Sequence, residues 1–256
     1  MTKTAVIIQA RMGSSRLPGK MLLELARRPA ISHVLERAQH IAGADVVCCA
    51  VPDTADSDAL ADTVGNSGAV LFRGSEHDVL DRYYRAARHL GADVILRLTG
   101  DCPLIDPVLC SAVISLRAET GATYASNCMP AVWPHGLDCE AFPFDWLERA
   151  AREATDPLHR EHVAPFIRLH PEARHATLPG PGRDLSDHRW TLDTPADLTF
   201  LRALFDRLPD GPEGWPYRVP LGIVEADPAL AAINLGAGKK NWSDPPAPPV
   251  PRSQNT

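Results

Sequence analysis

The chain has 256 residues, of which 45% are hydrophobic, and a formal net charge of −6. That hydrophobic share can supply a sizeable core. The negative balance argues against nucleic acid or an anionic membrane as a partner. The longest apolar stretches are too short to span a bilayer, and the amino terminus lacks the charged-then-apolar pattern of a signal peptide. A cytoplasmic protein is therefore expected.

Cysteine spacing indicates the state of the thiols, and composition indicates where the domain begins and ends. The six cysteines form no CxxC pair and no metal-finger spacing, so they are expected to be reduced, apolar residues. No Gly/Ser linker or block of charge divides the chain, which predicts one domain over residues 1–242, with halves of about 1–120 and 121–242. Residues 243–256 are rich in proline and are expected to be a disordered tail.

Strands and helices alternate in the first half of the predicted structure. Residues 5–10, AVIIQA, are short, apolar and rich in β-branched side chains, as expected of a strand buried on both faces. Residues 21–25 are expected to be extended. Further strands are predicted over residues 45–52, 69–74 and 93–101, and helices over 31–41, 53–65 and 78–90. This alternation is typical of a parallel sheet with right-handed crossovers, a Rossmann-like α/β layer.

The second half alternates less regularly. Strands are predicted over residues 123–127, 136–142 and 188–193, and helices over 146–154, 161–169 and 195–205. Pro195 suits the first turn of the last helix, because the N–H that proline lacks has no partner there. The second half is therefore expected to extend the same sheet.

The loop after the first strand concentrates positive charge on backbone that can approach a ligand closely. Its charged, small and hydroxyl residues are Arg11, Gly13, Ser14, Ser15, Arg16, Gly19 and Lys20. Ligands of open α/β sheets bind beyond the carboxyl ends of the strands, so the loop predicts a polyphosphate site. A solvated basic loop is the alternative. Because loop side chains are usually exposed, changing Arg16 or Lys20 is expected to leave folding intact.

The loop matches neither common phosphate-binding motif. Five residues separate Gly13 from Gly19, and Met21 follows Lys20, whereas a Walker A loop has four residues between its glycines and Ser or Thr after the lysine. A dinucleotide fingerprint needs a second glycine two residues after Gly13, and that position holds Ser15.

Five motifs carry a resemblance to a known family. They are IIQARMGSSRLPGKMLLEL from residue 7, RLTGDCPLIDP from 97, GLDCEAF from 136, REHVAPFI from 160 and WTLDTPADL from 190. In this order they resemble the cytidylyltransferases related to the spore-coat polysaccharide protein SpsF, which are similar to synthetases of CMP-activated acidic sugars. The resemblance implies a nucleotide-diphospho-sugar transferase fold with a mixed, mainly parallel sheet. It also implies CTP and a small acidic acceptor as substrates.

The resemblance assigns the loop cations to the triphosphate. Arg11 and Arg16 each present a planar fork, while Lys20 is a point charge able to follow charge on the leaving pyrophosphate. Arg82 corresponds to a segment near the base, with an ion pair to Asp78 as the alternative. The CTP-binding set expected in this way is Gln9, Ala10, Arg11, Gly13, Ser14, Ser15, Arg16, Lys20, Arg82, Thr99 and Gly100.

Two aspartates are candidate ligands of Mg²⁺. Asp101 and Asp193 each end a predicted strand and precede a helix, and each matches the family's metal-binding aspartate. Mg²⁺ takes one or two carboxylates together with substrate phosphates. A helix-capping or turn role is the alternative for either residue alone. Asp197 is expected to serve the helix dipole. The catalytic residues are thus predicted to be Arg11, Arg16, Lys20 and Asp101.

Two later motifs are candidates for the acceptor site. Asp138 and Glu140 alternate along a predicted strand and could face sugar hydroxyls or a second metal, although a solvated strand face is the simpler account. His159, Arg160 and His162 could hold an acidic acceptor's carboxylate or pack at a dimer interface. A homodimer is expected.

The function expected is transfer of CMP from CTP to an acidic sugar or related acceptor, with release of pyrophosphate. A nucleotide-sugar-dependent glycosyltransferase of related fold is one alternative, but such enzymes usually carry a DxD pair, and GDCP lacks the second aspartate. A non-catalytic nucleotide-binding relative is the other. Retention of the loop cations together with Asp101 and Asp193 argues against it.

Overall fold

A seven-stranded sheet forms the centre of the computed structural model, which describes residues 2–209 and 215–237. Its strands are β1 (Thr4–Gln9), β4 (Val46–Pro52), β5 (Val70–Gly74), β6 (Val94–Thr99), β7 (Tyr124–Ser126), β8 (Glu140–Pro143) and β9 (His175–Thr177), in the order β5-β4-β1-β6-β8-β7-β9. The first four in that order are parallel, and β8 runs antiparallel to both neighbours. The predicted mixed, mainly parallel α/β sheet is confirmed.

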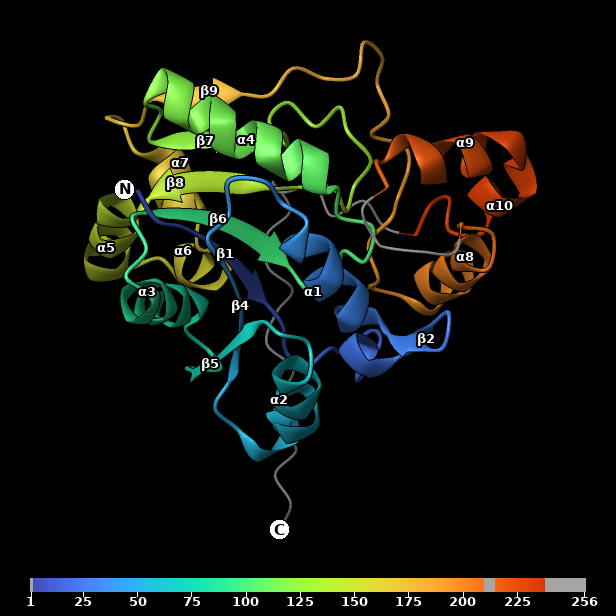
Figure 1. The fold of residues 1–256 in the computed structure, drawn as a ribbon, viewed down its shortest axis with the longest axis horizontal. Coiled ribbons are helices and arrows are strands. Elements are labelled where there is room, and N and C mark those ends of the chain that lie inside the picture. Colours follow the sequence, from blue (N-terminus) through green and yellow to red (C-terminus); the bar gives the residue numbers. More distant parts are fainter. Residues whose placement is uncertain (1, 210–214, 238–256) are drawn as a thin grey trace.

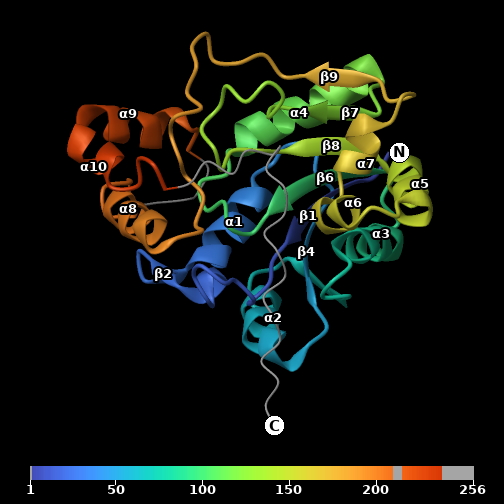
Figure 2. The ribbon, with the colours of Figure 1, turned by 180° about the vertical axis from the view of Figure 1, so that it is seen from behind.

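Helices cover both faces of this sheet because its central strands are apolar on both sides. Val6 and Ile8 of β1 face the cluster that includes α1 (Ala30–Gln39), α2 (Asp58–Gly65) and α4 (Pro107–Thr120). Ala5 and Ile7 face the cluster of α3 (Val79–Leu90), α5 (Phe144–Glu153) and α7 (Pro165–Leu169). Figures 1 and 2 show α3 and α5 opposite α4 across the sheet. Full burial of each isoleucine contributes roughly 1.5–3 kcal/mol.

A third core cluster lies beside the sheet. It joins the short hairpin of β2 (Glu24–Leu25) and β3 (Arg28–Pro29) to α8 (Pro195–Phe205), α9 (Arg218–Ala226) and α10 (Pro228–Ala232). These helices gather on the side away from α5 (Figure 1). Helix α8 begins as predicted, with Pro195 in its first turn and a capping box between Thr194 and Asp197.

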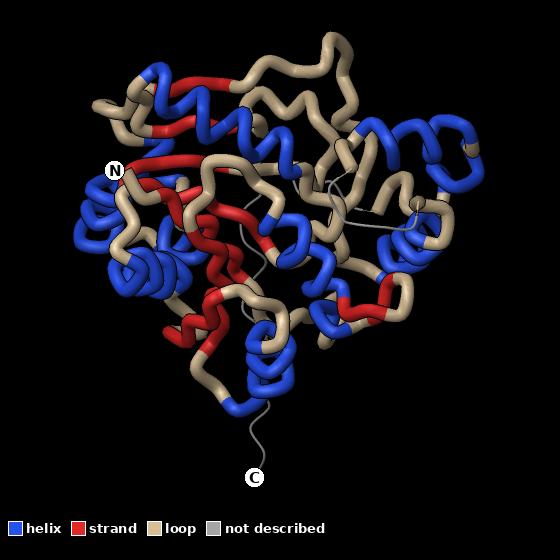
Figure 3. The backbone as a smooth tube through the Cα atoms, in the orientation of Figure 1, coloured by secondary structure: helices blue, strands red, loops and turns tan. Residues whose placement is uncertain are grey.

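Two predicted elements of the second half are wrong. The helix expected over 161–169 is two short helices, α6 (Pro157–His162) and α7, because Val163 has a φ of 68° and Pro165 starts a new turn. The strand expected over 188–193 is loop, drawn in tan in Figure 3. No strand among residues 2–209 and 215–237 pairs with it, and its backbone hydrogen bonds there go to loop residues, with one bridge between His135 and Arg189.

Two other predicted strands are shorter than expected. The strand predicted over 136–142 begins only at Glu140, since Gly136 has a φ of 112°. Residues 21–25 contain the end of a 3₁₀ turn, Lys20–Leu22, before β2. The six cysteines are free, as expected.

No helix among the described residues is both long enough and apolar enough to cross a membrane. The proline-rich tail predicted over 243–256, and the domain limit at 242, lie outside the described residues.

Candidate active site

The loop after β1 folds back on itself and delivers Lys20 to the interior. Gly19 has a φ of 68°, a conformation that glycine adopts without strain, and its N–H donates to the carbonyl of Met12 at 3.2 Å. Lys20 follows in a 3₁₀ turn and is only 7% exposed. A residue with a side chain at Gly19 would be strained there, so the glycine is what allows the loop to place the lysine.

Lys20 lies between the two aspartates predicted to bind a metal. Its Nζ is 2.7 Å from Asp101 Oδ2 and 2.7 Å from Asp193 Oδ1. The two carboxylates therefore meet at one point, since their oxygens cannot be further apart than twice that distance. Asp101 comes from just beyond β6, and Asp193 from just before α8. The structure thus brings together residues from three distant parts of the chain at the carboxyl edge of the sheet.

Opposite charges keep this cluster ionised. Burial would raise the pKa of Asp101, but the charge of Lys20 and its hydrogen bond outweigh burial and lower that pKa to about 2. Burial would likewise lower the pKa of Lys20, but the two carboxylates raise it. Lys20 and Asp101 are therefore both charged at neutral pH. The ammonium satisfies two carboxylates that would otherwise repel each other.

Asp193 is also held by two guanidinium groups. Its Oδ2 is 3.2 Å from Arg16 and 3.2 Å from Arg189. Arg189 forms a second, forked interaction with the fully buried carboxylate of Asp197. Asp197 thus does more than complement the helix dipole. Sequence reasoning missed Arg189, although a cation four residues before a candidate metal ligand was a usable signal.

Glu140 takes part in a buried network instead of lining an open acceptor site. Arg97 Nη1 donates to Glu140 Oε2 at 2.5 Å, and the hydroxyl of Tyr124 donates to Glu140 Oε1 at 2.6 Å. Arg97 Nη2 also donates to Gln9 Oε1 at 3.1 Å. A guanidinium only donates, so Gln9 must turn its carbonyl oxygen toward Arg97 and its NH₂ away. This network fixes the amide at the end of β1.

Asp138 lies before β8 and has a different partner. Its Oδ2 is 3.3 Å from His135 Nδ1, so the predicted strand face carrying Asp138 and Glu140 together is not formed. The hydrogen bond that His135 donates to Asp138 raises the pKa of His135, although burial opposes it. The backbone of His135 is bonded to His188 and Trp190, next to Arg189. Sequence reasoning missed His135, which directly precedes the GLDCE motif.

Arg82 and Arg160 have structural partners. Arg82 is 1% exposed, donates to the carbonyl of Ser75, and has its pKa lowered by burial. Arg160 forms an ion pair with Asp78 at 2.6 Å. It also donates hydrogen bonds to the backbone carbonyls of Ala151, within α5, and of Ala154, just after α5. It therefore ties α6 to α3 and α5. Asp78 is thus paired with Arg160, and it also caps α3 by accepting a hydrogen bond from the N–H of Asp81. An ion pair between Arg82 and Asp78, the alternative for Arg82, would have to compete with these contacts.

The remaining predicted residues have the following surroundings. Arg11 is half-exposed and 3.8 Å from Glu161 of α6, and the ring of His159 packs edge-on against Phe166. His162 is partly exposed. At Gly100 an added Cβ would lie 2.9 Å from Ile31 and 3.0 Å from Ala10, so this glycine lets the end of β6 approach the end of β1. The other predicted residues take these places: Ala10 is buried, Thr99 contacts the thiol of Cys102, Ser14 accepts from the N–H of Leu17, and Gly13 and Ser15 lie in the same loop.

The donor set fits Mg²⁺ only in combination with substrate oxygens. In the part of the chain that the structure describes, no three His, Cys, Asp or Glu side chains converge on one point. Asp101 and Asp193 do converge, and Mg²⁺ needs no more than two protein carboxylates when phosphates and waters complete its shell. The residues present are therefore compatible with this ion.

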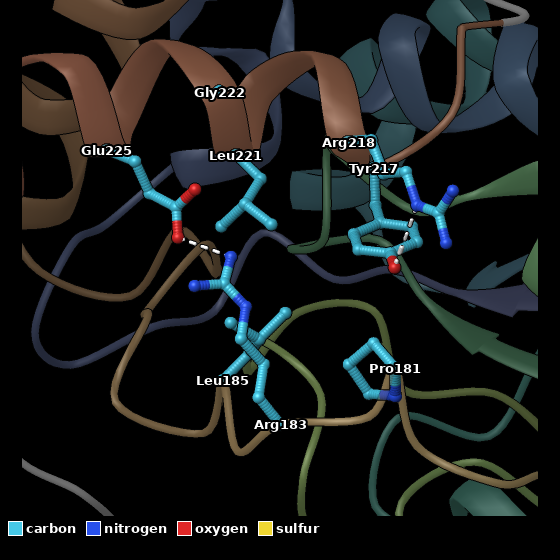
Figure 4. Close-up of a pocket in the computed structure, with 8 residues that line it drawn as sticks. All are labelled: Pro181, Arg183, Leu185, Tyr217, Arg218, Leu221, Gly222 and Glu225. Carbon is cyan, nitrogen blue, oxygen red and sulfur yellow. Dashed lines mark hydrogen bonds and ion pairs between the residues drawn. The ribbon is translucent and has the colours of Figure 1, made fainter.

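A separate hollow of about 260 Å³ lies between residues 181–185 and α9 (Figure 4). An ion pair between Arg183 and Glu225 crosses it, and Arg218 donates to the hydroxyl of Tyr217 at its edge. Its lining residues are Pro181, Arg183, Leu185, Tyr217, Arg218, Leu221, Gly222 and Glu225. They include none of the residues predicted for the site.

A mainly parallel sheet, a cationic loop after its first strand and paired carboxylates at its carboxyl edge define a protein that handles nucleotide phosphates. The family model described as cytidylyltransferase matches residues 5–198. The chain belongs to the cytidylyltransferase family, and it is therefore a nucleotidyltransferase. Membership favours the predicted enzyme class over the glycosyltransferase alternative.

Two relatives match most of the chain, and a third matches about half of it. The spore coat polysaccharide biosynthesis protein SpsF of Bacillus subtilis is 33% identical over 222 residues, covering 83% of this chain and 90% of that protein. An uncharacterized protein of Methanocaldococcus jannaschii is 32% identical over 93% of this chain and 97% of its own length. A 3-deoxy-manno-octulosonate cytidylyltransferase of Anaeromyxobacter dehalogenans is 41% identical over 51% of this chain and 53% of that enzyme.

Solved structures give the same fold. A cytidylyltransferase from Leptospira borgpetersenii superposes with a TM-score of 0.85 at 29% identity, covering 90% of this chain and 97% of that one. CMP:2-keto-3-deoxy-manno-octonic acid synthetase, solved with CTP, superposes with a TM-score of 0.61 at 23% identity, covering 80% and 99%. The fold is thus the nucleotide-diphospho-sugar transferase fold that the motifs imply.

Proposed function

We propose that this protein transfers CMP from CTP to an acidic sugar or related acceptor, with Mg²⁺ as cofactor. An acceptor oxygen attacks the α-phosphorus, the bond from that phosphorus to the oxygen bridging to the β-phosphate breaks, and pyrophosphate leaves with the bridging oxygen. The proton of the acceptor hydroxyl passes to a base or to solvent. The observation that carries this proposal is the meeting of Lys20, Asp101 and Asp193 at the carboxyl edge of the sheet.

The chain's contribution is positioning and charge. Arg11 and Arg16 bind phosphate oxygens, and Lys20 leaves the two carboxylates to follow charge onto the departing pyrophosphate. Asp101 and Asp193 would hold Mg²⁺, which when bound would neutralise phosphate charge.

The names of the relatives support the choice of substrates. A matching structure was solved with CTP, and the matching cytidylyltransferases carry the acidic sugar 3-deoxy-manno-octulosonate in their names. His135 pairs with Asp138 and forms a backbone bridge with Arg189, which supports a role for His135 and Asp138 in contacting the acceptor. The expected homodimer stays a prediction.

The test is pyrophosphate release from each of the four nucleoside triphosphates, with Mg²⁺ and a panel of sialic-acid-like, octulosonic-acid-like and phosphonate acceptors. We expect release only with CTP and one acceptor class, and a CMP-linked product by mass spectrometry. EDTA should abolish it. Acceptor-dependent release from another triphosphate, or release that EDTA leaves unchanged, would contradict the proposal.

A further inference from the structure

Asp197 is a buried carboxylate surrounded by donors. Its side chain is fully buried, and it accepts hydrogen bonds from two nitrogens of Arg189, at 2.9 and 3.1 Å. Thr194 contributes its backbone N–H and its hydroxyl, at 2.9 and 3.0 Å. A capping box needs only the backbone part of these contacts. The carboxylate is therefore bound more extensively than starting helix α8 requires.

Asp197 holds Asp193 in two ways. The backbone N–H of Asp193 donates to Asp197 Oδ2 at 3.1 Å, which fixes the main chain at that residue. Arg189 Nη2 touches Asp197 Oδ2 and Asp193 Oδ2 together, at 3.1 and 3.2 Å, which fixes the side chain. Both the position and the rotation of the Asp193 carboxylate thus depend on one buried pair.

The contacts divide the two oxygens of Asp193 between different tasks. Oδ2 is taken by Arg16 and Arg189, while Oδ1 faces Lys20 and, across it, Asp101. Arg189 can hold Oδ2 only because its fork is anchored on Asp197. Oδ1 is therefore the oxygen left for the cation that the two aspartates share.

Asn234 completes this arrangement from the far end of the described chain. Its Nδ2 donates to Asp197 Oδ1 at 3.0 Å and to the carbonyl of Arg189 at 2.9 Å, and it is 4% exposed. It lies beyond residues 5–198, the part matched by the family model. A segment outside that match thus supports the metal-binding edge.

We infer that Arg189, Asp197 and Asn234 form a positioning unit that presents Oδ1 of Asp193 to the divalent cation. This inference rests on the proposed function. None of the three residues needs to touch substrate, because they act through Asp193. Partners of this kind typically change metal affinity 10- to 100-fold when they are altered.

Binding of Mn²⁺, read by electron paramagnetic resonance with the α,β-methylene analogue of CTP present, tests the inference. Arg189→Lys keeps a cation but loses the fork, so we expect the Kd for Mn²⁺ to rise about 10-fold or more. Analogue binding in EDTA should change little. Asn234→Ala should shift the Kd for Mn²⁺ in the same direction but less, and Thr199→Ala, on the exposed side of α8, should not shift it.

Measuring Arg189→Lys in the Asp193→Asn variant distinguishes positioning of Asp193 from a merely structural role of Arg189. There Arg189→Lys should leave the residual Mn²⁺ affinity unchanged, because it acts only through Asp193. An equal loss in both backgrounds, or wild-type Mn²⁺ affinity in Arg189→Lys, overturns the inference. If Arg189→Lys does not fold, unchanged Mn²⁺ affinity in Asn234→Ala overturns it. Failure of the wild-type protein to bind the analogue or Mn²⁺ instead contradicts the proposed function.

Discussion

Lys20 and Arg16 belong to the same loop but differ in burial. The side chain of Arg16 is 43% exposed, whereas that of Lys20 is 9% exposed and lies between two carboxylates. The expectation that both side chains are exposed is therefore wrong for Lys20. Removing the cation of a buried ion cluster leaves uncompensated charge, which is far more costly than losing an exposed ion pair.

Lys20→Met should lower the free energy of unfolding by about 3 kcal/mol, while Arg16→Ala should change it by about 0.5 kcal/mol or less. Urea denaturation measures both. Either change should cut turnover roughly 100-fold, because a partner of the transition-state charge is lost. Equal stability of the two variants would contradict the assigned burial of Lys20.

Lys20→Met has a second expected effect. Without the ammonium, Asp101 and Asp193 repel each other unless a cation enters, so Mn²⁺ should bind the nucleotide-free variant more tightly than the nucleotide-free wild-type protein. Titration of Mn²⁺ by paramagnetic resonance measures this, and Arg16→Ala is the control from the same loop. If Lys20→Met binds Mn²⁺ no more tightly than the wild-type protein, the ammonium of Lys20 does not occupy the position of the metal ion.

His135 carries a pH-dependent signature that can be read directly. The hydrogen bond that His135 donates to Asp138 raises the pKa of His135 above the usual 6.5, against the effect of burial. The stabilisation from this pair is therefore fully present below about pH 6.5 and is lost as the pH rises through the folded pKa. Asp138→Asn should lower the pKa of His135 in an NMR titration of its ring proton. An unchanged pKa would show that Asp138 is not the cause.

At the scale of elements, hydrophobic periodicity and local end signals predicted the regular strands and helices. The apolar run of β1, the stripes of α1 and α3 and the first turn of α8 all follow from local sequence. The strand predicted over 188–193 was wrong, because Trp190 and Leu192 alternate as in a strand but are buried against helices, and no strand in the described part of the chain pairs with them. An apolar pattern in the sequence shows that side chains such as Trp190 and Leu192 are buried. It does not show whether a strand or a helix packs against them.

The candidate site, like the fold, could be predicted where its residues follow local sequence patterns. Loop cations and strand-end aspartates could be recognised because each follows a strand, where a parallel sheet brings ligands together. Residues that enter the site through long-range contacts could not. Arg189, His135 and Asn234 are placed by the packing of the second half, and Glu140 looked exposed until its pairing with Arg97 was known.

The junction of β1 and β6 is the element-scale feature most open to test. Gly100→Ala would place a Cβ 2.9 Å from Ile31 Cδ1, 3.0 Å from Ala10 Cβ and 3.1 Å from the carbonyl oxygen of Gln9. The end of β6 must then shift, and Asp101 with it, at a cost of about 1–3 kcal/mol in unfolding free energy. Gly65→Ala, where a Cβ meets nothing within 4 Å, is the control. Thermal unfolding that ranks the two variants equal would contradict this packing.

At the scale of the molecule, the site depends on all three core clusters. The sheet and its two helical layers place the loop after β1 and Asp101. The third cluster, around Trp190, Leu192 and Phe200, holds the segment that carries Arg189 and Asp193. The helices after residue 198 therefore belong to the catalytic fold, although the family match ends there.

Calorimetric titration of the protein with CTP, ATP, GTP and UTP, each with Mg²⁺, tests the central claim most directly. The account predicts that CTP binds more tightly than the other three and that EDTA weakens its binding. Equal affinities for the four triphosphates, or no binding of CTP, would contradict it.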